Sequence, residues 1–202
     1  NYVISTGGLT NTSRVLPFME ESIVSEGDGA LLLKYNIESA FDWGGGSQFR
    51  IRHPEDQGLW DFSEYESLSI DFYNKVPSSF PGRATLQLIF FDASEINQLS
   101  AWGLIGMEWW YSYHQVLDLE QGWNKIEISL EDVGVESSTG FYLPVNDGSG
   151  VVGNNSLDLD KIRAFAIGVV VSGPNDSENI SGEFVLDNFL LHPGTSTASA
   201  SL

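Results

Sequence analysis

An aromatic run from Trp109 to His114 contains the side chains of this sequence that are best suited to hold a ligand. Successive side chains of a strand point to opposite faces. One face would carry Trp109, Tyr111 and Tyr113, and the other would carry Trp110, Ser112 and His114. A protein core needs only one of these faces, so the second is left to present flat rings and polar groups. Such rings stack on the C–H faces of sugars while polar neighbours bond the hydroxyls.

The two faces of this run differ in the residues that continue them along the strand. The face of Trp109 continues to the apolar residues Leu117 and Leu119, which indicates the core. We therefore predict that Trp110 and His114 stand on the open face. A shift of the register by one residue would exchange the two faces.

Polar and aromatic side chains on other predicted strands complete the binding face. Each alternates with apolar residues of its own strand, so it points away from the core. The predicted ligand-binding residues are Arg50, Arg52, Asp71, Tyr73, Gln87, Trp110 and His114, with Trp102 and Trp43 at the ends of a concave groove. In an alternative interpretation, the rings complete the core while the arginines and aspartates pair on a solvated sheet.

Asp187 lies in the apolar segment Phe184–Leu191, with hydrophobic neighbours on both faces. A buried carboxylate is unfavourable unless it is paired or bound to a cation. Oxygen ligands suitable for calcium occur near the N-terminus, and the first and last strands of a sandwich are often neighbours. The expected ligands of a structural Ca2+ are Asp187, Glu20, Glu26 and Asp28. In the alternative, Asp187 accepts hydrogen bonds from loop amides.

The sequence contains no recognisable catalytic constellation. The histidines, His53, His114 and His192, lie on separate elements without metal-ligand spacing. Cysteine is absent, which excludes disulfides, thiolate nucleophiles and Cys-ligated zinc. Asp118 and Glu120 are close in sequence, and glycosidases use two carboxylates, but no third acid follows in the spacing common in sandwich-fold hydrolases. We predict that the domain is not an enzyme, with a glycan hydrolase or lyase as the alternative.

The elements that position these residues are predicted to be strands. Two-residue alternation of apolar and polar side chains runs through most of the chain. The predicted strands are 30–37, 48–53, 67–74, 85–92, 108–119, 123–130, 163–171 and 182–191. Clusters of Gly, Asn, Asp, Ser and Pro separate them. The pattern predicts an all-β fold, a two-sheet antiparallel β-sandwich of the jelly-roll type, with a closed barrel as the alternative.

Composition limits the domain count and the classes of partner. The chain has 202 residues, 42% of them hydrophobic, which suits one globular domain with a buried core. Nine basic and 28 acidic residues give a net charge of −19, which argues against nucleic acid and anionic membranes as partners. No apolar run approaches the roughly 20 residues that a membrane helix needs. We expect one module over 1–192, with a linker-like tail over 193–202, cut from a longer or processed protein.

Several short motifs along the chain resemble one group of binding modules. They are Phe18-Met19-Glu20, Gly29–Tyr35, Tyr65–Tyr73, Gly122–Ile126 and Gly182–Phe189. Through these motifs the chain is similar to the galactose-binding-like jelly rolls of carbohydrate-binding modules, most nearly family 11. The resemblance implies a non-catalytic β-sandwich that binds a β-glucan or a similar chain in a concave groove. It also implies a structural Ca2+, with Asp187 as its best-marked ligand.

The residues and the resemblance together predict a bacterial module, secreted or at the cell surface, that targets a larger protein to a polysaccharide. Its expected partners are the polysaccharide and further domains of the same chain, without nucleic acid or membrane insertion. A second hypothesis is a β-sandwich domain for protein interaction or cell-surface attachment that binds no sugar.

Overall fold

The computed structural model describes residues 3–52, 58–93, 108–134, 139–143 and 153–194. The strands are β1 (Val3–Gly8), β2 (Arg14–Glu20), β3 (Ala30–Glu38), β4 (Gly45–Arg52), β5 (Tyr65–Val76), β6 (Ala84–Asp92), β7 (Glu108–His114), β8 (Gly122–Ser129), β9 (Val133–Gly134), β10 (Phe141–Tyr142), β11 (Ile162–Val171) and β12 (Asn179–Pro193). A short 3-10 turn, η1 (Leu159–Lys161), precedes β11. Among the described residues no helix is long and apolar enough to cross a bilayer.

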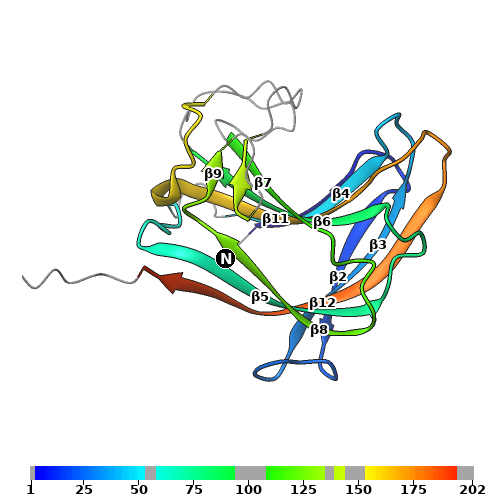
Figure 1. Cartoon of the computed structure of the whole chain (residues 1–202), viewed down its shortest axis with the longest axis horizontal. Helices are drawn as coiled ribbons and strands as arrows, with labels where there is room; N and C mark the ends of the chain where they lie inside the picture. The colour runs from blue at the N-terminus through cyan, green and yellow to red at the C-terminus, as the bar shows by residue number, and fades with distance from the viewer. Residues whose placement is uncertain (1–2, 53–57, 94–107, 135–138, 144–152, 195–202) are drawn as a thin grey trace, which may run out of the picture.

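The strands form two sheets that pack face to face, with the seven-stranded sheet above the five-stranded one in Figure 1. The order is β1-β4-β11-β6-β7-β10-β9 in the first sheet and β2-β3-β12-β5-β8 in the second. Neighbouring strands are antiparallel, except that β9 and β10 are parallel. The predicted all-β jelly-roll sandwich is confirmed.

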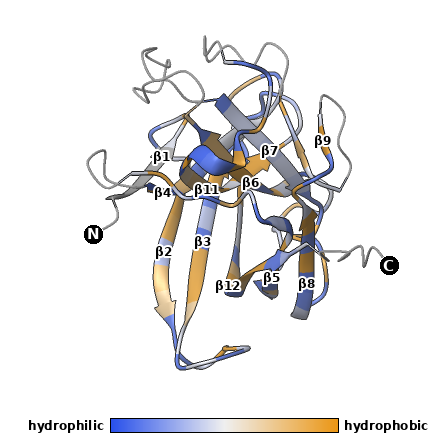
Figure 2. Ribbon diagram, turned by 90° about the vertical axis from the view of Figure 1, so that its left-hand side faces the viewer, coloured by the Kyte–Doolittle hydropathy of each residue, from blue (hydrophilic) through white to orange (hydrophobic). Residues whose placement is uncertain are grey.

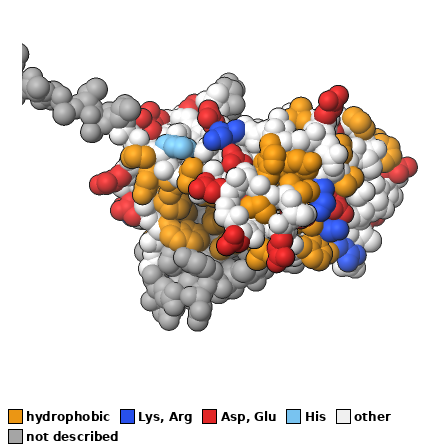
Figure 3. Space-filling model, turned by 90° about the horizontal axis from the view of Figure 1, so that it is seen from below, with side chains coloured by type: hydrophobic (Ala, Val, Ile, Leu, Met, Phe, Trp, Pro, Cys, Tyr) orange, Lys and Arg blue, Asp and Glu red, His pale blue; other side chains and the backbone are white. Residues whose placement is uncertain are grey.

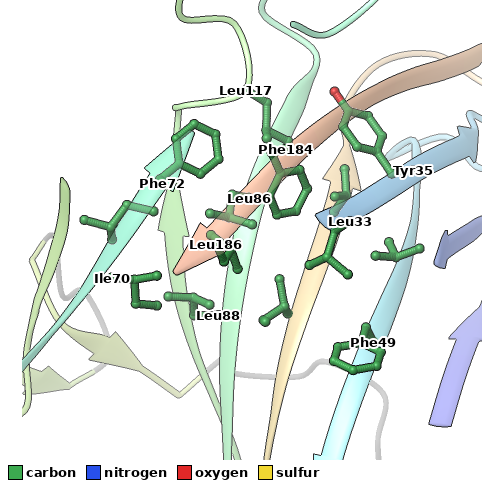
Figure 4. Close-up of a cluster of buried hydrophobic side chains, with 14 of the residues drawn as sticks. Leu33, Tyr35, Phe49, Ile70, Phe72, Leu86, Leu88, Leu117, Phe184 and Leu186 are labelled. Atoms are coloured by element: carbon green, nitrogen blue, oxygen red, sulfur yellow. The ribbon is translucent and has the colours of Figure 1, made fainter. Parts of the chain in front are cut away.

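The core lies between the sheets and is built from the inward half of each alternating strand (Figure 4). Phe72 of β5 and Phe184 of β12 stack with their ring centroids 5.7 Å apart, and Phe90 of β6 stacks on Phe141 of β10 at 4.5 Å. All four rings are at most 2% exposed. Full burial of such a side chain stabilises a fold by about 1.5–3 kcal/mol. The two sheets are therefore held together mainly by apolar contact.

The predicted strands agree with the observed ones to within a few residues, with one notable difference. Strand β7 ends at His114, whereas the predicted strand continues to residue 119.

Just before β4, Gly44 has a φ of +117°, and a Cβ there would lie 1.7 Å from the carbonyl oxygen of Val171. Glycine is thus required for β4 to start close beside β11.

One end of the sandwich is hollow. A cavity of about 560 Å³ lies between β2, β3 and β12 on one side and β4 and β11 on the other. Its walls are mostly apolar and include Leu31, Phe49, Ile51, Phe165, Ile167 and Leu186. Figure 2 shows β2 and β3 running together below the seven-stranded sheet to their connecting segment. The sheets therefore pack less densely at this end than around Phe90 and Phe141.

Candidate functional site

Strand β7 carries the aromatic run, and its two faces are the reverse of the prediction. Trp110 is 2% exposed and pairs in register with Phe90 of the core. Its Nε1 donates a 3.0 Å hydrogen bond to Oδ2 of Asp92, which is itself fully buried. A ring enclosed in this way offers no surface to a ligand, so the prediction that Trp110 stands on an open face is wrong.

His114 belongs to the same inward row of β7. It lies opposite the core residue Leu86, and its Nε2 is 3.0 Å from Oγ of Ser112. Burial lowers the pKa of His114 to about 4, so its imidazole is neutral at pH 7. The sheet itself separates His114 from Arg50 and Gln87, with which it is predicted to act; that placement is also wrong.

The outer face of the seven-stranded sheet carries the other half of the aromatic run. The register sets Arg50, Ala166, Ile89 and Tyr111 side by side in one row, from β4 through β11 and β6 to β7. The next row consists of Gln48, Gly168, Gln87 and Tyr113. We call this surface the arginine–tyrosine face and define it by Gln48, Arg50, Arg52, Gln87, Tyr111, Tyr113 and Tyr142 around the small residues of β11. It brings together the predicted site residues Arg50, Arg52 and Gln87.

Strand β11 forms the middle of this face and is low there, because its outward side chains are Ala164, Ala166 and Gly168. A Cβ at Gly168 would lie 3.1 Å from Oε1 of Gln87, so the glycine leaves room for that amide above the strand. The arginines of β4 stand on one side of this low strand, and the tyrosines of β7 and β10 stand on the other. Ala164 and Ala166 are 0% and 1% exposed, so the neighbouring side chains cover this strand, and a ligand would contact those side chains and not β11 itself.

Arg50 extends across the low strand. Its Cζ is 5.0 Å from the ring centre of Phe91, which lies on β6, two strands away. Its Nε is buried and has no hydrogen-bond partner in the described part of the chain, and the same holds for Oε1 of Gln48. Burial lowers the pKa of Arg50, the charge of Arg52 lowers it further, and Tyr111 opposes this shift. The side chain remains a cation at neutral pH, with donor capacity to spare.

Three tyrosines form the opposite side of the face. Tyr113 and Tyr142 stack with ring centroids 5.4 Å apart, and Tyr111 lies 6.1 Å from each of them. Nε2 of Gln87 donates a 2.8 Å hydrogen bond to the Tyr113 hydroxyl. Burial, together with Tyr113, raises the pKa of Tyr142, so this phenol is neutral at physiological pH. Sequence analysis missed Tyr142, because β10 has two residues and no alternation can be recognised over that length.

Exposure varies along the face. Phe91 is 0% and Trp109 is 6% exposed, so these rings support the surface from within. Tyr113, four residues along the same strand from Trp109, is 40% exposed. The end of the face at Tyr113 and Gln87 is therefore where a ligand would first touch an aromatic ring.

Asp71 and Tyr73 lie on the other sheet, so the predicted site combines residues from opposite sides of the molecule. They point outward from β5 in the five-stranded sheet. Tyr73 contacts Trp123 of β8 edge to face, at 5.3 Å between centroids. Asp71 accepts a 2.8 Å hydrogen bond from Ser25 Oγ and lies 3.7 Å from Nζ of Lys125. Grouping these two residues with Arg50 is therefore wrong.

The two tryptophans predicted at the groove ends have different outcomes. Trp43 lies two residues before β4, is 52% exposed, and stacks on Phe41 at 5.4 Å with an interplanar angle of 7°. Its contact with a ligand stays a prediction. Trp102 lies outside the described residues.

The carboxylate of Asp187 is surrounded by hydrogen-bond donors. Its Oδ2 accepts hydrogen bonds from the backbone N–H of Ser25 (2.7 Å), from that of Glu26 (3.1 Å) and from Ser25 Oγ (3.0 Å). Burial alone would raise the pKa of Asp187, but these donors and the N–H of Asn188 outweigh it and lower the pKa. Amide hydrogens directed at an oxygen disfavour a cation at the same place. This geometry agrees with the alternative interpretation of the sequence, in which Asp187 accepts hydrogen bonds from loop amides.

The other expected calcium ligands do not join Asp187. Glu20 forms a 2.6 Å ion pair with Lys75, and the hydrogen bonds from Lys75 and then Ser22 lower its pKa to about 2. Glu26 and Asp28 are exposed. Within the described residues no three His, Asp or Glu side chains are grouped as metal ligands would be. As placed, these four residues do not fit a calcium ion, and calcium binding stays a prediction of the sequence.

Comparison with known proteins finds similar solved structures but no family for the chain. No protein-family model matches it, and no curated protein matches it. A solved structure from work on promiscuous carbohydrate-binding modules of the beta-sandwich superfamily is 10% identical, with a TM-score of 0.49, and covers 93% of this chain and 56% of that chain. The cellulose-specific module CBM28 is 12% identical, with a TM-score of 0.48, and covers 88% of this chain and 82% of that chain.

An enzyme is also among the similar structures. The beta-1,2-glucanase from Parabacteroides distasonis is 17% identical, with a TM-score of 0.46, and covers 96% of this chain but 23% of that chain. The chain therefore spans about half of the first structure named above and less than a quarter of the enzyme. At these identities the likeness concerns the fold alone, and the likeness to family 11 stays a resemblance.

Proposed function

We propose that this domain binds a polysaccharide, without cleaving it, on the arginine–tyrosine face. Tyrosine rings offer flat surfaces to the C–H faces of sugar rings, while amide and guanidinium groups hydrogen-bond to hydroxyls. One observation carries the proposal: Tyr111, Tyr113 and Tyr142, with Gln87 beside Tyr113, face Arg50 across a strand of small residues, and Tyr113 is 40% exposed.

The distribution of carboxylates supports a binding role without catalysis. Hydrolysis of a glycosidic bond needs two carboxylates, about 5–10 Å apart, at the bound sugar. On the described strands β4, β6, β7 and β11, no Asp or Glu belongs to the outward rows of this face. Asp92 and Glu108, at the ends of β6 and β7, belong to the inward rows and are 0% and 3% exposed.

The proposal includes a larger protein that carries this domain. A binding domain without catalysis acts by holding a partner domain near the polysaccharide, which raises the effective concentration of that partner. We therefore include further domains of the same chain, and a location outside the cell or at the bacterial surface, in the proposed function. We propose this location because the domain would encounter a polysaccharide there.

Affinity electrophoresis in gels that contain a glucan, a xylan, a mannan or alginate tests the proposal. We expect at least one polysaccharide to retard the protein, and Tyr113→Ala to weaken that binding about tenfold, or about 1.4 kcal/mol. Trp123→Ala is the matched control, because Trp123 is equally exposed but lies on the other sheet. It should bind like the unaltered protein.

Two results would contradict the proposed function. The first is the absence of retardation by any polysaccharide, which would favour the second hypothesis, attachment to a protein partner. The second is undiminished binding by a Tyr113→Ala variant whose circular dichroism and melting temperature are native.

A further inference from the structure

The two cations of the arginine–tyrosine face form no ion pair with any described residue. Nine Lys and Arg are present against 28 Asp and Glu, so most cations have a carboxylate within reach. Five of them form ion pairs among the described residues: Lys34, Lys75, Arg83, Lys125 and Lys161. The other four, Arg14, Arg50, Arg52 and Arg163, form none with any described residue, and of these Arg50 and Arg52 stand together on one face and are only partly exposed. Two guanidinium groups thus share one face without a described counter-ion.

Among the described residues, this arrangement places two like charges next to each other. Arg50 and Arg52 are two residues apart on the same side of β4, which sets their Cα atoms about 7 Å apart. Each charge opposes the other, and burial removes part of the water that would stabilise Arg50. Partly buried charges are usually paired. An anionic ligand would place a negative charge next to both guanidinium groups.

We propose that the arginine–tyrosine face recognises an acidic polysaccharide whose sugars carry carboxylate groups, a polyuronate. The sugar rings would lie against Tyr113 and Tyr142, and the carboxylates would bind Arg50 and Arg52 across the low strand β11. This inference rests on the proposed function and names the ligand class of the same face.

The geometry of Arg50 suits a carboxylate. Its guanidinium is close to the Phe91 ring at 5.0 Å, which restrains the side chain and leaves N–H edges for a ligand. A carboxylate matches the planar fork of two parallel N–H groups, and such charge-assisted pairs are stronger than bonds to a hydroxyl. A neutral glucan could hydrogen-bond to Gln87 and to the tyrosine hydroxyls. It would bring no negative charge to Arg50 and Arg52.

The net charge of −19 does not prevent this interaction. At physiological ionic strength the screening length is about 8 Å, so acids on distant parts of the surface are largely screened, whereas direct contacts are not. Among the described residues, the titratable side chains that share the face with the arginines are the tyrosines Tyr111, Tyr113 and Tyr142, and its outward rows on β4, β6, β7 and β11 hold no carboxylate.

The test compares polygalacturonate with the same polymer after its carboxylates have been reduced to alcohols. Binding is measured by isothermal titration calorimetry at pH 7 and 0.15 M NaCl. We expect the polyuronate to bind at least tenfold more tightly than the reduced polymer. The variant Arg50→Gln/Arg52→Gln should lose this preference. The control Lys34→Gln/Lys125→Gln changes the net charge equally on the other sheet and should keep it.

The outcomes separate this inference from the proposed function. Equal affinity for both polymers would overturn the inference and leave polysaccharide binding intact. Binding of a sulfated galactan but of neither polygalacturonate nor alginate would also overturn it, because sulfate would then be the recognised anion. Binding of no polysaccharide would overturn the proposed function itself. Because the comparison of the two polymers uses the unaltered protein, it remains decisive even if the double variant fails to fold.

Discussion

The outer faces of the two sheets differ in how their polar side chains are satisfied. On the five-stranded sheet, Lys34 pairs with Glu183 at 2.8 Å, and Lys125 lies 3.7 Å from Asp71. Figure 3 views this side of the molecule, where lysines and arginines, acids and apolar side chains lie close together. On the seven-stranded sheet, Nε of Arg50 has no hydrogen-bond partner among the described residues.

Exposed rings do not distinguish the two faces. Trp123 on the five-stranded sheet and Tyr113 on the seven-stranded sheet are both 40% exposed. Part of the five-stranded face is also covered by its own chain, since Ile23 and Val24 pack on Leu32 and Val185. The useful criterion for a ligand site is therefore an exposed ring next to polar groups that have no partner among the described residues.

The largest effect is expected from the ring directly behind the arginine–tyrosine face. Trp110→Ala removes a side chain that fills the core and bonds Asp92, so the free energy of unfolding should fall by about 3–5 kcal/mol. Urea denaturation measures this loss. Trp123→Ala, on the exposed face of the other sheet, should cost less than about 1 kcal/mol. A loss below about 1 kcal/mol for Trp110→Ala would show that the inward and outward rows have been exchanged.

A smaller effect concerns His114 and the dependence of stability on pH. Its pKa is about 4 when folded and about 6.5 when unfolded, so the unfolded chain binds the proton first as the pH falls. The stability linked to this group is complete above pH 6.5 and is lost as the pH falls toward 4. Between pH 7 and pH 5 the loss should be about 2 kcal/mol.

Urea denaturation of the unaltered protein and of His114→Gln at both pH values measures the contribution of His114. The variant should lose about 2 kcal/mol less than the unaltered protein over this interval. Equal losses in the two proteins would mean that the imidazole is solvated, and that this end of β7 presents both rows to water.

The smallest effect is expected from a chelator acting on the five-stranded sheet. Asp187 is held by amides and Glu20 by Lys75, so EDTA should change the melting temperature by less than about 1 °C. Differential scanning fluorimetry at micromolar protein measures it. A decrease of several degrees that CaCl2 reverses would establish the calcium site predicted from the sequence.

The fold could be predicted because strand periodicity is a local property. In β5 and β6 the alternation of apolar and polar residues marks the buried side of each strand without any knowledge of its neighbours. The same reasoning fails for β7, because Trp109, Trp110 and Tyr111 make both of its faces equally apolar. Only the pairing of Trp110 with Phe90 decides which face is inward, and pairing is not local.

The site could be predicted in part for the same reason. Alternation shows that Arg50, Gln87 and Asp71 all point away from the core, and this is correct. It does not show that Asp71 belongs to the other sheet, because the assignment of a strand to a sheet depends on chain topology. For Asp187, the sequence shows a carboxylate between apolar neighbours, but the donors to its Oδ2, in Ser25 and Glu26, come from a segment 161 residues or more away.

The open cavity between β2, β3 and β12 on one side and β4 and β11 on the other means that the two sides of the arginine–tyrosine face are supported differently. Behind the tyrosines, Trp110, Phe90 and Phe141 fill the space between the sheets. Behind the arginines, the inward side chains of β4 are Phe49 and Ile51, and they border the hollow. A wall with few atoms behind it yields more readily than a filled one. We therefore expect the arginine strand β4 to move more than the tyrosine side when a ligand binds.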